Sequence, residues 1–96
     1  MPVRWSSQAM RDAQRIFLHI ASENHYAATA VFEAFLRTAD SLAHHPYRHR
    51  NRGGGYRRVP VAHYDYFILY RMRPGVDGPY VSTESVRHVA RRPRSR

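Results

Sequence analysis

The chain contains no cysteine, no lysine and no long apolar run. Without cysteine it can form neither disulfides nor thiolate metal sites, and the cytoplasm is its expected compartment. No apolar stretch reaches the roughly 18 residues of a membrane span, and the charged N-terminal region does not resemble a signal peptide. Because lysine is absent, every cationic side chain is arginine. Arginine binds phosphate or carboxylate at any working pH but is a poor general base.

The charges that are present are distributed unevenly. The 96 residues carry 16 basic and 7 acidic side chains, for a net charge of +9. Residues 1–45 are neutral, and residues 46–96 carry the whole excess. This asymmetry predicts an anionic partner, either nucleic acid or an acidic protein segment; a solvated basic surface without a partner is the alternative. The short length predicts one domain, over residues 1–93, followed by a basic tail over residues 94–96.

Apolar spacing predicts a strand over residues 2–5 and then a helix that begins after the N-cap hydroxyls of Ser6 and Ser7 and ends near residues 22–24. The helix's expected apolar stripe is Ala9, Ala13, Ile16, Phe17 and Ile20, with Arg11, Asp12 and Arg15 on the opposite side. Asn24 is the predicted N-cap of a second helix. Its stripe is Ala27, Val31, Ala34, Phe35, Thr38, Ala39 and Leu42. This helix is expected to end at His44-His45-Pro46, because proline disfavours helical geometry in the preceding residue.

A glycine-rich loop over residues 46–55 is followed by predicted strands over residues 56–61, 63–72 and 80–89. The order β-α-α-β-β-β predicts an α+β fold, in which an antiparallel helical hairpin packs on one face of a small, mostly antiparallel sheet. The other face is left largely uncovered, so aromatic residues of the middle strand are available to a partner. Tyr64, Tyr66 and Tyr70 lie at half-buried strand spacing, which suits either packing or a platform for a partner helix or a base.

Short motifs follow one another along nearly the whole chain. In order they are Trp5-Ser6-Ser7-Gln8-Ala9 with Asp12 and Ile16, Asn24-His25-Tyr26-Ala27-Ala28, Ser41-Leu42-Ala43 with Pro46, Tyr56-Arg57-Arg58-Val59-Pro60-Val61, Tyr66-Phe67-Ile68-Leu69-Tyr70-Arg71, and Val86-Arg87-His88-Val89-Ala90-Arg91-Arg92-Pro93. Together they resemble the ParE/RelE toxin superfamily, and the last is closest to ParE-like members. Two segments depart from it. Arg48-His49-Arg50 replaces a Gly-Arg pair, and the polar residues 82–85 replace apolar ones, so the last strand is expected to be less well buried.

The resemblance implies the toxin of a type II toxin–antitoxin system, neutralised by a cognate antitoxin. Its RelE-like members are ribosome-dependent mRNA endonucleases, and its ParE-like members inhibit DNA gyrase. An endonuclease needs proton-transfer groups and a phosphate clamp, which RelE-like enzymes supply with lysines, arginines and a C-terminal tyrosine. Here lysine is absent and no tyrosine follows Tyr80. We therefore expect a gyrase inhibitor rather than an enzyme. A RelE-like endonuclease and a non-toxic basic nucleic-acid-binding module remain alternatives.

Candidate site residues follow from these expectations. If the chain is an endonuclease, its catalytic candidates are Arg57, Arg58, Arg87 and His88. His88 is more simply explained as a strand-end histidine bonded to the backbone. The residues expected to bind the target or the antitoxin are Arg57, Arg58, Tyr66, Tyr70, Arg71, Arg87, His88, Arg91 and Arg92. The antitoxin is expected to be an acidic, amphipathic segment that folds on binding and forms a hetero-oligomer with the toxin. The target is gyrase, or else the ribosome with its mRNA. We expect no metal or cofactor.

Overall fold

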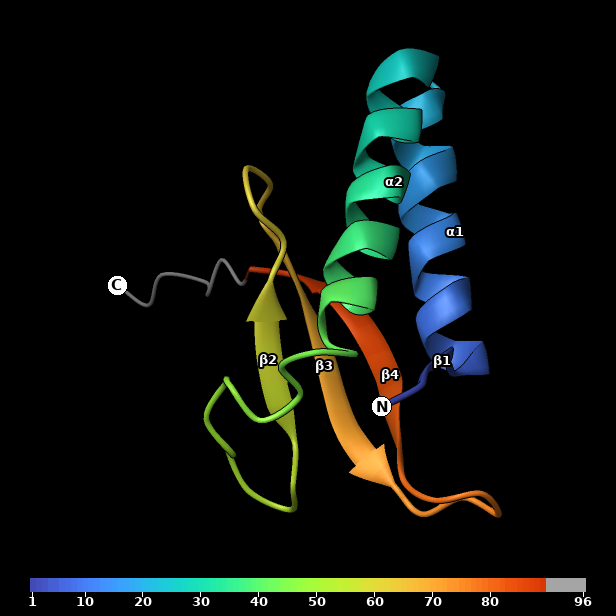
Figure 1. Ribbon diagram of the computed structural model, residues 1–96. Helices are drawn as coiled ribbons and strands as arrows, with labels where there is room; N and C mark the ends of the chain where they lie inside the picture. Colours follow the sequence, from blue (N-terminus) through green and yellow to red (C-terminus); the bar gives the residue numbers. More distant parts are fainter. Residues whose placement is uncertain (90–96) are drawn as a thin grey trace.

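The computed structural model describes residues 1–89 (Figure 1). Its elements are β1 (Val3–Trp5), α1 (Ser7–Ala21), α2 (His25–Ser41), β2 (Arg57–Pro60), β3 (Tyr66–Arg73) and β4 (Tyr80–His88). The strands form one sheet in the order β1-β4-β3-β2, in which β1 is parallel to β4 and the other neighbours are antiparallel. Both helices lie side by side on one face of the sheet (Figure 1). The predicted α+β fold, with its helical hairpin and mostly antiparallel sheet, is therefore confirmed.

Side-chain caps begin both helices, as the sequence predicts. The Ser6 hydroxyl accepts a hydrogen bond from the Ala9 N–H at 3.0 Å, and the Asn24 side chain accepts one from the Ala27 N–H at 3.0 Å. Each cap satisfies one of the backbone donors that the first turn of a helix leaves unpaired. Ser6 therefore marks where α1 begins, and Asn24 marks where the chain turns into α2.

Two predicted boundaries are wrong. The strand predicted from residue 63 begins only at Tyr66, because His63 adopts a left-handed backbone with φ of 74° and the Tyr64 N–H closes a turn onto the Val61 carbonyl at 3.2 Å. The second helix ends at Ser41 rather than at residues 44–46, because the chain turns there before it reaches the proline. Both differences shorten an element without changing the order of elements.

The core lies between α2 and the sheet, and its largest fully buried side chains include Phe35, Ile68 and Tyr70. Tyr70 alternates with its strand neighbours so that its ring faces the helices beside Ile68. Its hydroxyl donates to the Pro46 carbonyl at 2.8 Å, which ties the chain after α2 to the sheet. Burial raises the pKa of this phenol. The prediction that Tyr70 contacts a partner is therefore wrong, since the ring has no exposed surface.

Asp12 corrects the predicted polar side of the first helix. Only 4% of Asp12 is exposed, whereas Arg15 is exposed as expected. One carboxylate oxygen accepts from the Val86 N–H at 3.0 Å, and the other accepts from Gln8 at 2.7 Å and from Arg15 at 3.2 Å. The helix passes so close to β4 at this point that a short acidic side chain reaches the strand's backbone. Asp12 thus joins the first helix to the last strand.

The last strand is also better buried than its polar sequence suggests. Ser82, Thr83 and Ser85 are all buried, because β4 lies between β3 on one side and β1, followed by α1, on the other. Pairing with β3 shifts register by one residue between Leu69 and Tyr70, which leaves Glu84 as the extra residue of a β-bulge. The bulge sets the positions of the charged side chains described next.

Candidate functional site

Within residues 1–89 no helix covers the second face of the sheet, which we call the open face (Figure 1). Side chains alternate along a strand, so the open face carries the β3 residues that alternate with the buried Ile68 and Tyr70. Residues of β1, β2 and β4 that pair directly or through a neighbouring strand with these β3 residues lie on the same face. Its residues are Arg4, Arg58, Pro60, Phe67, Leu69, Arg71, Arg73, Tyr80, Ser82, Glu84, Ser85 and Arg87. The open face is therefore rich in arginine and contains a single carboxylate among these residues.

Arginines on this face are stacked on aromatic rings. The pairs, with the distance from the guanidinium carbon to the ring centroid, are Arg4 on Tyr80 at 4.3 Å, Arg58 on Phe67 at 4.6 Å, and Arg71 on Tyr56 at 4.6 Å. A cation over a ring face is attracted by the ring quadrupole and is held in place by it. Stacking uses the face of the guanidinium group and leaves its in-plane N–H donors free for carboxylate or phosphate oxygens. These arginines are thus positioned before any partner arrives.

Two adjoining hollows cross the open face, and we call them together the basic groove. One has a volume of about 500 Å³ and is lined by His49, Arg50, Arg52, Arg58, Pro60, Phe67, Arg87, His88 and Val89. The other has a volume of about 490 Å³ and is lined by Gln8, Arg52, Gly53, Tyr56, Arg58, Leu69, Glu84, Ser85 and Arg87. Arg52, Arg58 and Arg87 line both. Three cations from a loop and two strands therefore converge on one concave surface that suits an extended anionic partner.

Glu84 does not neutralise this groove, because Arg73 already pairs with it. Arg73 donates two hydrogen bonds to the Glu84 carboxylate, from Nε at 2.9 Å and from Nη2 at 3.2 Å. Arg71 Nε lies 3.8 Å from the same carboxylate. The hydrogen bonds from Arg73 hold the pKa of Glu84 below its usual 4.5, although partial burial opposes them. The positive charge of Arg52, Arg58 and Arg87 therefore remains available to a partner.

The Glu84 pair predicts a pH-dependent contribution to stability. A carboxyl whose pKa is lower in the folded state stabilises the fold above the unfolded pKa, here near 4.5, and loses that contribution as the pH falls through the folded pKa. We expect Glu84→Gln to lower the free energy of unfolding by about 1 kcal/mol at neutral pH, since the pair is partly exposed. Urea unfolding at neutral pH and at about pH 3 measures this. If Glu84→Gln loses the same free energy of unfolding at both pH values, the contribution does not come from the ionised Glu84 carboxylate.

The structure separates the predicted binding residues. Arg58, Arg71 and Arg87 lie on the open face. Arg57 points the other way, because it precedes Arg58 in the same strand. Its guanidinium donates to the His49 carbonyl and lies 5.2 Å from the Tyr47 ring, so Arg57 fixes the loop after α2. Arg91, Arg92 and the tail over residues 94–96 lie outside the described residues.

Tyr66 and His88 lie on the face that carries the helices. The Tyr66 ring centroid is 5.4 Å from that of Phe35 and 5.1 Å from that of His88. His88 Nδ1 lies 2.8 Å from the Val89 carbonyl, so this nitrogen carries the hydrogen and donates it. The expectation of a strand-end histidine bonded to backbone is confirmed. Of the endonuclease candidates, Arg58, Arg87 and His88 therefore line the basic groove, whereas Arg57 points to the other face of the sheet.

Several groove residues escaped the sequence predictions. Arg52 lies in the loop that the three glycines marked as flexible, yet Asn51 organises that loop by accepting from the N–H groups of Gly53 at 2.8 Å and Gly55 at 3.2 Å. Both glycines have positive φ, at 117° and 83°, which glycine adopts without strain. An Asn-x-Gly sequence is a known turn signal and was the available clue. Arg4, which lies beyond the basic groove, was also missed, because its place depends on the pairing of β1 with β4.

A solved structure with the same architecture is described as "Chromosomal ParDE TA system from P. aeruginosa". It matches with a TM-score of 0.79 and 14% sequence identity, over 94% of this chain and 97% of that chain. At that identity the likeness establishes the fold. No curated protein sequence matches the chain. Within residues 1–89, no helix is both long enough and apolar enough to cross a bilayer.

The sequence itself matches a family model over residues 3–93. That family is the ParE toxin of the type II toxin–antitoxin system parDE. The chain belongs to this family. It is the toxin component of such a system, and the resemblance drawn from its motifs is confirmed.

Proposed function

We propose that this toxin arrests growth by binding DNA gyrase through the basic groove, and that it does not cut RNA. The observation that supports a binding role is the convergence of Arg52, Arg58 and Arg87 on one concave surface. These side chains stay protonated and can hold an anionic surface, but they do not transfer protons readily. The choice of gyrase follows from ParE-like members of the superfamily, which the chain resembles at its C-terminal motif.

A second candidate function, an mRNA endonuclease, draws support from His49. His49 is one of the residues that line the basic groove together with Arg58 and Arg87. Burial, together with the charge of Arg48, lowers the pKa of His49, which favours the neutral imidazole. A neutral imidazole beside arginines is the arrangement that a general base and a phosphate clamp would need. The two candidates share one surface and differ in whether a covalent bond is broken.

Two assays on the purified toxin separate these candidates. We expect the toxin to abolish supercoiling of relaxed plasmid by gyrase and to leave mRNA on translating ribosomes intact. A matched variant, His49→Gln, should inhibit supercoiling as well as the parent, since the groove keeps its charge. Codon-phased mRNA cuts with normal supercoiling, lost in His49→Gln, would replace the gyrase proposal with the endonuclease. Normal growth and no activity in either assay would favour a non-toxic nucleic-acid-binding module.

The proposed function also includes neutralisation by an antitoxin in the cytoplasm. The related solved structure is described as a ParDE system, which pairs a toxin with a second component. The net charge of +9 favours an acidic segment as the bound part of that component, in a hetero-oligomer. Such a segment stabilises the toxin if it binds only the folded state, so the complex should melt above the free toxin.

A further inference from the structure

Positive charge on the open face continues beyond the basic groove, towards β1. Arg4 pairs with Ser82, and Ser82 pairs with Arg71, so these residues form one row across β1, β4 and β3. Arg87 belongs to a second row, because it pairs with Phe67, which precedes Arg71 by four residues on β3. At about 3.4 Å per residue, the two rows lie about 13 Å apart. The open face therefore presents cations at two separated places.

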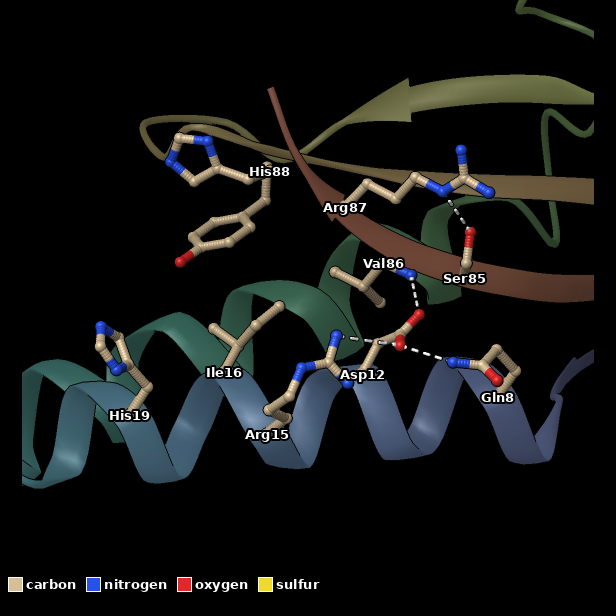
Figure 2. Close-up of a pocket in the computed structure, with 10 residues that line it drawn as sticks. Gln8, Asp12, Arg15, Ile16, His19, Ser85, Val86, Arg87 and His88 are labelled. Atoms are coloured by element: carbon tan, nitrogen blue, oxygen red, sulfur yellow. Dashed lines mark hydrogen bonds and ion pairs between the residues drawn. The ribbon is translucent and has the colours of Figure 1, made fainter. Parts of the chain in front are cut away.

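The arginines at these two places are held in position and keep donors free. Figure 2 shows Arg87 pointing away from α1, where its Nε donates to the Ser85 hydroxyl at 3.2 Å. Its terminal nitrogens remain available to a partner. Arg4 is exposed, and its guanidinium carbon lies 4.3 Å from the centroid of the Tyr80 ring. Among residues 1–89, no carboxylate lies within ion-pair distance of Arg4 or Arg87.

Aromatic rings on and beside the open face are covered by arginine. The rings of Tyr56, Phe67 and Tyr80 each lie under a guanidinium group. A protein partner is usually held by aromatic or aliphatic anchors in well-packed pockets, and a single-stranded nucleic acid by bases that stack on free rings. The covered rings favour neither. Exposed guanidinium edges suit a partner that offers anionic oxygens and needs no apolar contact, which is the phosphate backbone of a duplex.

The density of charge on the partner leads to the same choice. Duplex DNA carries one negative charge per about 1.7 Å of its axis, so a length of about 13 Å carries about eight phosphates on its two strands. An extended peptide turns one side chain towards the sheet about every 7 Å, so the same length offers about two carboxylates. Duplex DNA thus supplies several anions to each row.

We infer that the open face binds the sugar-phosphate backbone of duplex DNA without reading its sequence, with the basic groove at one end of the contact and Arg4 at the other. The biological source of that DNA rests on the proposed function, in which it is the segment that gyrase holds. Phosphate contacts fix the position of a protein on a duplex but carry no sequence information. The affinity should therefore depend strongly on salt and little on sequence.

Two pairs of variants separate a defined contact from the general attraction of a cationic protein to DNA. Arg4→Ala removes an exposed arginine from the open face, and Arg11→Ala removes an exposed arginine from α1. The double variant Arg58→Ala with Arg87→Ala is matched in the same way by Arg11→Ala with Arg37→Ala. The net charge is equal within each pair, so a difference between its members reports the position of the charge.

Binding of a fluorescent duplex of about 20 base pairs, or two helical turns, is measured by anisotropy between about 50 and 200 mM salt. We expect log Kd to rise with log salt at a slope of about 3.6, from about 0.9 for each of Arg4, Arg52, Arg58 and Arg87. Arg4→Ala should lower this slope by about 0.9, and the Arg58 and Arg87 double variant by about 1.8. The helix variants should keep the slope of the parent. Duplexes of unrelated sequence should bind equally, and a single strand of the same length no more tightly.

Equal slopes for Arg4→Ala and Arg11→Ala would overturn the inference, as would tighter binding of the single strand or no binding of the duplex. Tighter binding of a peptide of alternating glutamate and valine, about six residues long, would assign the face to a protein partner instead. The assay contains no gyrase. A toxin that inhibits supercoiling without binding the duplex keeps its proposed target and loses the DNA contact, and the opposite result does the reverse. Circular dichroism confirms that each variant is folded before slopes are compared.

Discussion

Replacing both Arg58 and Arg87 by alanine should abolish growth arrest while leaving the toxin folded. Both side chains are exposed, and both line each hollow of the basic groove, so their loss removes contacts to a partner more than contacts within the fold. A charge-assisted contact contributes about 1.5–3 kcal/mol, so two of them change the Kd for the target by more than about a hundredfold. Loss of the stacking on Phe67 costs the fold only about 0.5–1 kcal/mol.

A second double variant, Arg11→Ala with Arg37→Ala, is the matched control. It removes the same charge from exposed helix positions that lie outside the basic groove. Growth after induction, gyrase supercoiling and circular dichroism are compared for the parent and the two variants. If the control loses toxicity to the same extent, net charge rather than the groove carries the activity. Full toxicity of the Arg58 and Arg87 variant would remove the groove from the mechanism.

Asp12→Ala should lower the free energy of unfolding by about 2–4 kcal/mol, because it leaves the buried Val86 N–H without a partner and detaches α1 from β4. That is a large part of the roughly 5–15 kcal/mol that stabilises a small domain. Asp12→Asn is the matched control. It keeps an oxygen for Val86 and loses the charge and the hydrogen bond to the exposed Arg15, so it should cost less than half as much.

Urea unfolding of the parent and both Asp12 variants gives these free energies. Hydrogen exchange at Val86 gives an independent measure, since its amide should exchange faster in Asp12→Ala than in Asp12→Asn. Equal losses in the two variants would mean that the Asp12–Val86 bond contributes nothing and that the charge alone matters. Gln8, which also bonds Asp12, can rotate its amide to suit either partner.

The sequence predicts well whatever depends on neighbours in the chain. The caps at Ser6 and Asn24 and the stripe containing Val31 and Phe35 are local patterns, and the structure has them as expected. Asp12 shows what such local patterns cannot predict. Its position on the helix looks solvent-facing, and its burial follows from a strand that lies 74 residues away along the chain.

The candidate site was predictable only in part for the same reason. Alternation in the sequence already implied that Arg57 and Arg58 point to opposite faces. Which of them faces the helices depends on how β2 registers against β3, and that register places Arg57 opposite Tyr70. The arginine-rich composition thus indicated an anionic partner. The convergence of the loop residue Arg52 with Arg87 required the folded sheet.

The pairing of β1 with β4 joins the two ends of the described chain, and this has a consequence during synthesis. Ser6 bonds to Glu84, 78 residues further on, so the native contacts include some of the longest-range ones available to the chain. High contact order slows folding, because a long loop must close before those contacts form. On the ribosome, β1 and α1 emerge long before their partner strand. A nascent chain lacks Arg87 until β4 has been synthesised, so the basic groove is complete only after the last strand has emerged.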